Sequence, residues 1–379
     1  MTTSRLRLHF NENTAGCSPA VIDALRTLTA EDIATYPDYD AITAKVAAWL
    51  GVDAGSVLLT NGLDEGLYAV SQAGVQGRHE VGPYAPVSAD IPAGRHEDGP
   101  YASEAPGGPD EMDRRGRPRV GPCQFIQTDP TFEMFEAFTR IVGADLVRIA
   151  PDMDFAFPLA RVLGTITPAT RVIYLVDPNN PTGLPLPDGA AETIAAAAPD
   201  AIVFVDEAYA DFSGRTLIGP ALARHANLVV GRTFAKGHGL AGLRIGALVA
   251  RPDTIERLRR VTPPFSVNIA AVRALEAALA DDAYLSWYVA QAAASRTMIA
   301  DFCHRRGLTH WPSAGNFVLV RVGPDASAIT RALAARGIDI RDKSTAPGCD
   351  GCLRLTAGVV AHTERLITDL EDILASRTN

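Results

Sequence analysis

The sequence predicts an α/β fold with a large domain, built on a mostly parallel sheet flanked by helices, and a smaller C-terminal α/β domain. Short apolar runs alternate with helical patterns from residue 57 to about residue 250. Alternation of this kind implies parallel strands with helices on both faces of the sheet. A second, shorter series of strands and helices follows a group of Ala-rich helical segments. The 379 residues are enough for a large core and two domains.

The strands expected in the large domain are short runs rich in Val, Ile, Leu and Phe. They cover residues 57–60, 123–127, 145–149, 171–176, 201–206, 227–231 and 245–249. Runs that are this short and this apolar are typical of parallel strands buried on both faces. Side chains at the carboxyl ends of such strands lie where α/β sheets place their ligand sites.

The C-terminal part is expected to begin with three helices, over residues 252–260, 267–279 and 282–306. The last helix is long enough to connect the large domain to the small one. The small domain should contain strands 316–320, 338–341 and 352–355 and helices 326–336 and 361–375. The chain is predicted to divide into three parts. Residues 1–45 form an N-terminal arm and helix that belong to the small domain and to a dimer contact. Residues 46–260 form the large domain, and residues 261–379 form the interdomain helices and the small domain.

Residues 75–122 interrupt this pattern and are interpreted as an insertion. The ten residues from Gly77 to Pro86 recur, with two changes, from Gly94 to Ser103, and two copies are too few for a repeat architecture. The surrounding Gly, Pro, Asp and Arg residues cannot bury a core. We therefore expect a mobile surface loop, with a metal or regulatory site at the paired Arg-His-Glu triplets as the alternative.

Composition and charge favour a soluble enzyme of the cytoplasm. Apolar residues make up 47% of the chain and charged residues 21%, both near the average for soluble proteins. The net charge of −9 argues against a nucleic-acid surface. The N-terminus has no apolar segment of signal-peptide length, and no apolar run is long enough to span a membrane.

The five cysteines are few, odd in number and scattered, which is typical of reduced thiols rather than of a disulfide framework. Cys349 and Cys352 have a spacing found in metal and redox sites. No second cysteine or histidine pair accompanies them, so we expect a turn leading into the strand at Leu353.

Lys236 lies in a stretch that suits covalent chemistry. It follows an apolar strand-like run, sits among small residues, and is followed eight positions later by a second cation, Arg244. A lysine amine that is desolvated or close to another cation becomes a nucleophile near neutral pH. Such an amine can form an imine with an aldehyde cofactor, whereas an isolated lysine after a strand would be a solvated surface group.

Three further segments supply what a site for pyridoxal 5'-phosphate needs. Asp206 ends an apolar strand, where a carboxylate can keep a pyridine nitrogen protonated. Asn180 lies in a turn rich in Pro, Asn and Gly, from which it could donate to the phenolate oxygen of the cofactor. A strand and a glycine turn lead into a helix at residues 57–66, and helix N-termini bind phosphate.

Together the motifs of the chain resemble those of histidinol-phosphate aminotransferases, a family of fold-type-I pyridoxal-phosphate enzymes. They are Asn-Gly-x-Asp-Glu at 61–65, Asp-Pro-Thr-Phe at 129–132, Asn-Asn-Pro-Thr-Gly at 179–183, Asp-Glu-Ala-Tyr at 206–209, Thr-Phe-x-Lys at 233–236, Leu-Arg-Ile-Gly at 243–246 and Cys-Leu-Arg-Leu at 352–355. The segments 8–19 and 35–38 also resemble the beginning of that family. The resemblance runs from about residue 8 to the C-terminus, broken by the insertion.

The resemblance implies how the cofactor ring would be held. Lys236 would bind the cofactor covalently and later carry a proton between Cα and C4' as general base and acid. Asp206 would pair with the pyridine nitrogen, and Asn180 and Tyr209 would hydrogen-bond the O3' oxygen. Phe132 would stack on the ring at a position where many relatives have Tyr.

The resemblance also implies the residues around the cofactor phosphate. They are Thr233, Arg244 and the segment made of Leu63, Asp64 and Glu65. Ala235 stands where relatives commonly have Ser, so one phosphate hydrogen bond would be missing. Tyr36 matches a tyrosine that reaches the phosphate of the neighbouring subunit, which implies a homodimer.

For the substrate, the resemblance assigns Arg354 to the α-carboxylate of glutamate, because a guanidinium binds a carboxylate through two parallel bonds. Arg341 would help hold the phosphate of histidinol phosphate, the alternative being a surface arginine at a strand end. Asn13 of the opening segment would also contact the substrate. His238 stands where relatives carry Phe or Tyr, and it either lines the pocket or replaces a packing aromatic.

The function implied is aminotransfer between histidinol phosphate and 2-oxoglutarate in histidine biosynthesis, without a nucleic-acid or membrane partner and without a metal. An aromatic or other amino-acid aminotransferase of the same subfamily is the close alternative. A phosphoamino-acid decarboxylase on the same fold is a more distant one. An effector-sensing regulator is disfavoured, because such proteins carry a DNA-binding domain before this fold and only a short arm precedes it here.

Overall fold

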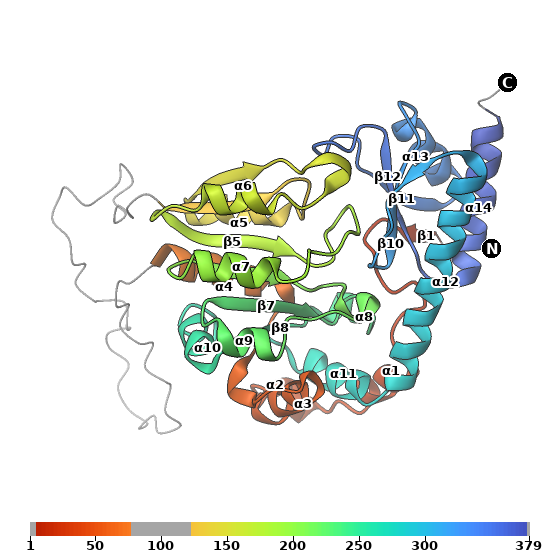
Figure 1. Cartoon of the computed structure of the whole chain (residues 1–379). Helices are drawn as coiled ribbons and strands as arrows, with labels where there is room; N and C mark the ends of the chain where they lie inside the picture. Colours follow the sequence, from red (N-terminus) through yellow and green to blue (C-terminus); the bar gives the residue numbers. More distant parts are fainter. Residues whose placement is uncertain (1–4, 77–122, 377–379) are drawn as a thin grey trace, which may run out of the picture.

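The computed structural model describes residues 5–76 and 123–376. The insertion predicted over 75–122, with its repeat and its Arg-His-Glu triplets, falls almost wholly outside these residues. Within the described chain, two sheets lie side by side and each carries its own helices (Figure 1). We call them the main sheet and the small sheet.

The main sheet has seven strands in the order β2-β8-β7-β6-β5-β3-β4. Their bounds are β2 Val57–Thr60, β3 Gln124–Thr128, β4 Asp145–Ile149, β5 Thr170–Val176, β6 Ile202–Asp206, β7 Leu228–Thr233 and β8 Gly246–Val249. Strand β8 runs antiparallel to both of its neighbours, and the other pairs are parallel. The mostly parallel sheet predicted from the alternation of apolar runs is therefore confirmed.

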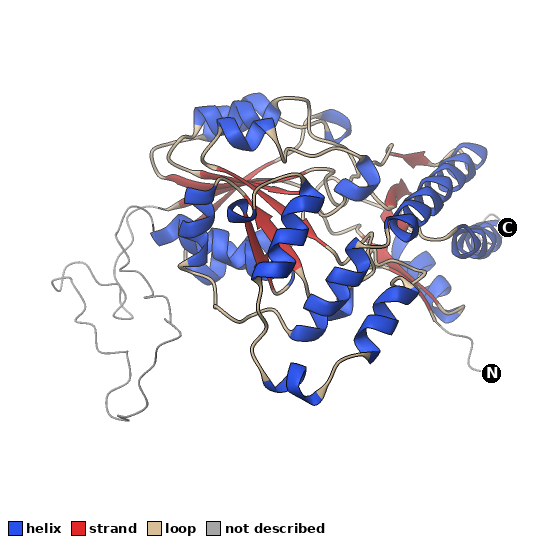
Figure 2. Ribbon diagram, turned by 90° about the horizontal axis from the view of Figure 1, so that it is seen from below, coloured by secondary structure: helices blue, strands red, loops and turns tan. Residues whose placement is uncertain are grey.

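Helices cover both faces of the main sheet because its strands are apolar on both sides (Figure 2). On β5, Val172 and Tyr174 join the core of one face, whereas Ile173 and Leu175 join the core of the other. The first core includes residues of α4 (Gly62–Gln76), α5 (Met134–Val142) and α10 (Pro252–Arg259). The second includes residues of α6 (Leu159–Thr165), α7 (Ala190–Ala197) and α9 (Pro220–Arg224).

The small sheet has five strands in the order β1-β11-β12-β10-β9. The bounds are β1 Leu6–Leu8, β9 Thr309–His310, β10 Phe317–Arg321, β11 Ile338–Asp342 and β12 Cys352–Thr356. Helices α12 (Asp282–Arg306), α13 (Ala326–Ala335) and α14 (Val360–Ala375) pack on it through one apolar core. Helix α12 runs from the neighbourhood of α11 (Ile269–Leu279) to this sheet, as its predicted length suggested (Figure 1).

The N-terminal arm begins with a short strand that was not predicted. Its strand β1 pairs in parallel with β11, with Leu6 opposite Ile338, and Leu6 and Leu8 are buried in the core of the small sheet. The arm then returns to the main sheet through α1 (Pro19–Arg26), α2 (Ala30–Ala34) and α3 (Asp40–Leu50). It therefore brings its residues 9–13 between the two sheets.

Cys349 and Cys352 form the predicted turn before β12. The amide of Cys352 donates to the Cys349 carbonyl at 2.9 Å, and both thiols are buried beside Trp311 and Leu319. All five cysteines are free. In residues 5–76 and 123–376, no cluster of three or more His, Cys, Asp or Glu could hold a metal ion. In the same residues, the helices are too short or too polar to cross a lipid bilayer.

Candidate active site

A cavity of about 610 Å³ lies between the two sheets, at the carboxyl ends of the central strands of the main sheet. Its wall combines the arm, the main sheet and its loops, and strands β11 and β12 of the small sheet. Eleven of the fourteen predicted site residues line it: Leu63, Asp64, Phe132, Asn180, Asp206, Tyr209, Thr233, Lys236, Arg244, Arg341 and Arg354.

The other three predicted residues do not line this cavity. The Glu65 carboxylate accepts hydrogen bonds from the Asn61 amide and the Ser266 hydroxyl and so braces the start of α4. Asn13 donates to the carbonyl of Gly237, at the turn after Lys236, at 2.9 Å. Tyr36 is 78% exposed and stacks on Phe265 at 4.4 Å between ring centroids.

Lys236 follows β7 and points its amine at the arm, where it donates to the Phe10 carbonyl at 2.8 Å. Burial, together with the charge of the nearby Arg354 guanidinium, lowers the pKa of this amine to about 8. Both effects favour the neutral amine, which is the form of lysine that acts as a nucleophile.

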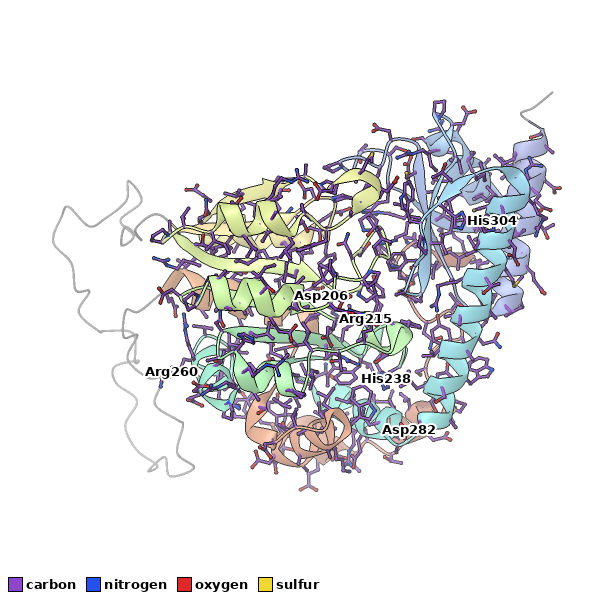
Figure 3. The ribbon with its side chains drawn as sticks, in the orientation of Figure 1. Asp206, Arg215, His238, Arg260, Asp282 and His304 are labelled. Carbon is purple, nitrogen blue, oxygen red and sulfur yellow. The ribbon has the colours of Figure 1, made fainter. Side chains whose placement is uncertain are left out.

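Asp206 ends β6 and faces the same cavity (Figure 3). One carboxylate oxygen accepts from the Ala208 amide at 2.9 Å, and the side chain is otherwise buried. Burial raises the pKa of Asp206 to about 6, opposed by the Ala208 hydrogen bond and the charge of Lys236. A cationic partner in the cavity would favour the ionised carboxylate.

Arg244 and the start of α4 form an anion-binding corner. Arg244 has a left-handed backbone, with φ of 54°, and donates to the Asp64 carboxylate at 2.8 Å. A Cβ on Gly62 would lie 2.4 Å from the Arg244 guanidinium, so any larger residue there would push the guanidinium aside. Leu63 and Asp64, at the start of the 15-residue helix α4, line the same cavity, and the helix dipole favours negative charge at that end.

Aromatic and amide groups line the middle of the cavity. Phe132 meets Phe135 edge to face at 5.8 Å between ring centroids, and its own ring lines the wall. Tyr209 is buried against Phe317, and its oxygen accepts a hydrogen bond from Asn11 at 3.0 Å. Asn180 accepts from Arg354. Together these side chains form an apolar wall beside a row of polar groups.

Arg354 is deeply buried in the cavity wall, with 6% of the residue exposed. It donates to the Asn180 side chain at 2.5 Å and to the His9 carbonyl at 2.6 Å, and it lies over the Phe317 ring. Its Nε has no hydrogen-bond partner. In residues 5–76 and 123–376 no carboxylate forms an ion pair with it. A buried guanidinium in this state is a site for an anion.

Arg341 lies opposite Arg354 on the neighbouring strand, at paired positions of β11 and β12. It is half-exposed and donates to Glu133 at 3.3 Å. Lys343, two residues later, is 8% exposed at its side chain and donates to the same carboxylate at 2.6 Å. The Arg341 side chain both lines the cavity and is 41% exposed, so the roles of phosphate ligand and of surface arginine both stay open.

His238 does not line the cavity and takes the place of a packing aromatic. It is 3% exposed and meets Trp49 and Phe234 at 5.3 and 5.4 Å between ring centroids. Beneath the Lys236 turn, Arg232 pairs with Asp211 at 2.6 Å and with Glu207 at 3.5 Å. These buried pairs tie the end of β7 to the segment after β6 and so help to fix Asp206 relative to Lys236.

Five ionisable residues of the cavity wall were not predicted, namely Arg7, His9, Glu12, Glu133 and Lys343. Three of them belong to the arm, whose pairing with β11 was not predicted. Glu133 directly follows the predicted Phe132, and Lys343 lies two residues after Arg341 on β11. The period-two alternation of a strand, which puts residues 341 and 343 on one face, is the signal that could have identified Lys343.

A family model and individual relatives of similar sequence both identify the chain as an aminotransferase. The family model described as aminotransferase class I and II matches residues 121–370. Histidinol-phosphate aminotransferase 1 of Thiobacillus denitrificans is 33% identical, over 98% of this chain and 86% of the relative. The corresponding enzyme of Moorella thermoacetica is 30% identical over the same shares.

Solved structures agree with this assignment. Histidinol-phosphate aminotransferase from Sinorhizobium meliloti, in complex with pyridoxal-5'-phosphate, has a TM-score of 0.78 and 25% identity, covering 98% of this chain and 91% of that one. L-threonine-O-3-phosphate decarboxylase from Porphyromonas gingivalis, at 22% identity and a TM-score of 0.72 over 98% and 99%, shares the fold. On the family match, the similarity along nearly the whole chain and the arrangement of the cavity, this chain belongs to the class I and II aminotransferases.

Proposed function

We propose that this aminotransferase uses pyridoxal 5'-phosphate and exchanges an amino group between histidinol phosphate and 2-oxoglutarate, as a step of histidine biosynthesis. The observation that carries the proposal is a concentration of positive charge in the cavity of an acidic chain. Among the described residues, the wall holds six Lys and Arg side chains and four carboxylates, whereas the whole chain has a net charge of −9. Such a cavity suits anionic ligands.

The residues present fit the cofactor. An aldehyde needs a neutral amine, and burial lowers the pKa of Lys236 toward neutrality. A pyridinium needs a carboxylate, and Asp206 is a buried carboxylate that faces the cavity and accepts a hydrogen bond from the Ala208 amide. A phosphate needs donors, which Arg244 and the start of α4 supply, and Gly62 leaves the room that a Cβ would fill. Thr233 adds a hydroxyl to that corner.

Pyridoxal phosphate, when bound, supplies an aldehyde for covalent attachment and a ring that withdraws electrons from the substrate Cα. The chain's own residues do the rest. The Lys236 amine would hold the cofactor aldehyde and would move a proton between the substrate Cα and C4'. Asp206 would keep the ring nitrogen protonated. Asn180 and Tyr209 would hydrogen-bond O3', and the Phe132 ring would stack against the cofactor and keep water from that face.

Substrate selection is assigned to Arg354 and Arg341. Arg354 is buried, is already oriented by Asn180 and the His9 carbonyl, and lacks a carboxylate, so it suits the α-carboxylate of glutamate. Arg341, at the paired position of β11, suits the second anionic group of a donor. An aromatic aminotransferase would have no use for this second cation. Asn13 then acts through the turn at Gly237 rather than by touching the substrate.

A homodimer in the cytoplasm is part of the same proposal. Tyr36 and Phe265 form an exposed stacked pair, and Ile33, at 70% exposure, lies three residues before Tyr36. Exposed apolar side chains in one region favour a contact with another chain. A second copy of this chain is the partner that we propose for this exposed surface, because Tyr36 could then reach the phosphate site of the neighbouring subunit. Sedimentation of the holoenzyme at equilibrium would measure the mass and test this part.

The function is tested with a panel of amino donors and 2-oxoglutarate as the acceptor. We expect the purified holoenzyme to give its highest kcat/KM with histidinol phosphate, above those with phenylalanine and tyrosine. A higher kcat/KM with phenylalanine would move the chain to the aromatic aminotransferases. Release of CO₂ from a phosphoamino acid, without amino transfer to 2-oxoglutarate, would identify a decarboxylase instead.

A further inference from the structure

An ion pair crosses the cavity from the main sheet to the small sheet. Glu133 lies between β3 and α5, directly after Phe132, and its carboxylate accepts from Lys343 at 2.6 Å and from Arg341 at 3.3 Å. Both cations belong to β11 and its end. All three side chains line the 610 Å³ cavity. The pair therefore lies within the site where the anionic part of the amino donor is expected to bind.

The two partners are buried to very different extents. The Lys343 side chain is 8% exposed, whereas that of Glu133 is 63% exposed. A buried ammonium without a partner is strongly unfavourable, whereas an exposed carboxylate is readily solvated. Glu133 is consequently the partner that can leave, and Lys343 is the one that requires an anion at all times.

The surroundings reinforce this need for an anion. Arg341, Lys343 and Arg354 come together on β11, its end and β12. Within the described residues, Glu133 is the carboxylate paired with this group, and it contacts only two of the three cations. Lys343 lowers the pKa of Glu133 through their hydrogen bond, so Glu133 is ionised at neutral pH. One negative charge thus faces three positive ones.

We propose that Glu133 is an internal substitute for the anionic tail of the amino donor, and that Lys343 is a third tail-binding cation, released when the donor displaces Glu133. The inference rests on the proposed function and refines its substrate class. A phosphate dianion brings two charges where Glu133 brings one, so it displaces Glu133 readily. The γ-carboxylate of glutamate competes on equal terms, and a neutral tail gains nothing by entering. The ion pair thereby selects donors by tail charge.

The test compares Glu133→Gln with Glu136→Gln in the holoenzyme, where the cofactor already fills its own phosphate site. Glu136 is a matched control, because it lies on α5 one turn away and pairs with Arg140 outside the cavity. The probe is inorganic phosphate, and its dissociation constant is measured by calorimetry. Removing the competitor should tighten phosphate binding roughly three- to tenfold in Glu133→Gln and leave Glu136→Gln unchanged.

Lys343→Met should weaken phosphate binding roughly ten- to a hundredfold, as loss of a charge-assisted bond predicts. Lys343→Arg, which keeps the charge, should restore most of it and shows that the loss is not due to misfolding. In the Lys343→Met background, Glu133→Gln should gain much less than in the wild type, because the two residues are coupled. The KM values should follow the same order, with a large effect for histidinol phosphate, a smaller one for glutamate and almost none for phenylalanine.

Weaker phosphate binding in Glu133→Gln would overturn the inference, since Glu133 would then be a direct contact of the ligand. Equal changes in Glu133→Gln and Glu136→Gln would also overturn it, by reducing the effect to net charge. Failure of the proposed function has a different signature. A wild-type enzyme that accepts glutamate but not histidinol phosphate would refute the substrate assignment, while the phosphate titrations would still test the Glu133–Lys343 pair.

Discussion

Replacing Gly62 with alanine should selectively damage cofactor binding. Gly62 begins α4 with φ of +69°, and a Cβ there would lie 2.4 Å from Arg244 Nη2 and 2.9 Å from its Cζ. Real Cβ atoms do not come so close to other heavy atoms, so the guanidinium has to move away from the corner that it shares with Asp64. The substitution at residue 62 therefore displaces the phosphate-binding guanidinium of Arg244, although Arg244 itself is not mutated.

The magnitude has two separable parts. Placing a Cβ in the left-handed region costs roughly 1–2 kcal/mol of folding free energy wherever it occurs. Displacing Arg244 removes a charge-assisted bond to the cofactor phosphate, worth roughly 1.5–3 kcal/mol, which is about ten- to a hundredfold in the dissociation constant of pyridoxal phosphate. The weaker binding of pyridoxal phosphate should be specific to the substitution at Gly62.

Gly143→Ala is the matched control. Gly143 has nearly the same backbone, with φ of +75°, but nothing lies within 4 Å of its Cβ position. Both variants should lose similar thermal stability in the apoprotein, measured by circular dichroism. Only Gly62→Ala should bind the cofactor more weakly, measured by titration of the apoprotein and its visible absorption. Equal dissociation constants in the two variants would refute the role assigned to Arg244.

Three further variants test the remaining roles. Lys236→Ala should lose the visible absorption of the bound cofactor and reduce transamination by well over a hundredfold, because proton transfer by a positioned base alone is worth about 10²–10⁴; a tenth of the wild-type rate would contradict this. Burial raises the pKa of Asp206 to about 6, so this carboxylate becomes protonated as the pH falls through 6. The affinity of the wild-type protein for the cofactor should fall over that range. The affinity of Asp206→Asn should not depend on pH in this way, and this variant should also turn over slowly. Arg341→Ala should raise the KM for histidinol phosphate roughly ten- to a hundredfold and leave phenylalanine nearly unchanged in steady-state assays; similar losses for both donors would make Arg341 structural.

The main sheet could be predicted closely because each of its strands is a short apolar run between polar residues. The structure confirms all seven, with ends shifted by two residues at most. Strand β1 was missed because it has three residues and pairs with β11, more than 300 positions away. No local pattern records such a pairing. The two-residue strand β9 was missed for the same reason of length.

The candidate site could likewise be predicted only where its residues lie in local motifs. Four of its residues occur in contiguous motifs next to strands and were predicted to lie together: Lys236, Asp206, Asn180 and Arg244. The Glu133–Lys343 pair joins segments 210 positions apart across the two sheets, and only the packing of those sheets brings it about. A motif also does not determine where each of its side chains points. The motif that contains Glu65 was identified from the sequence, but the Glu65 side chain accepts a hydrogen bond from Ser266 and does not line the cavity.

The central claim is that the cations of the cavity recognise a phosphorylated amino donor. The most direct measurement is the ratio of kcat/KM for histidinol phosphate to that for histidinol, with 2-oxoglutarate as the acceptor, because the two donors differ only in the phosphate. With at least one charged bond to the phosphate from Arg341 or Lys343, we predict a ratio of roughly one hundred or more. Comparable values for the two donors would contradict the account.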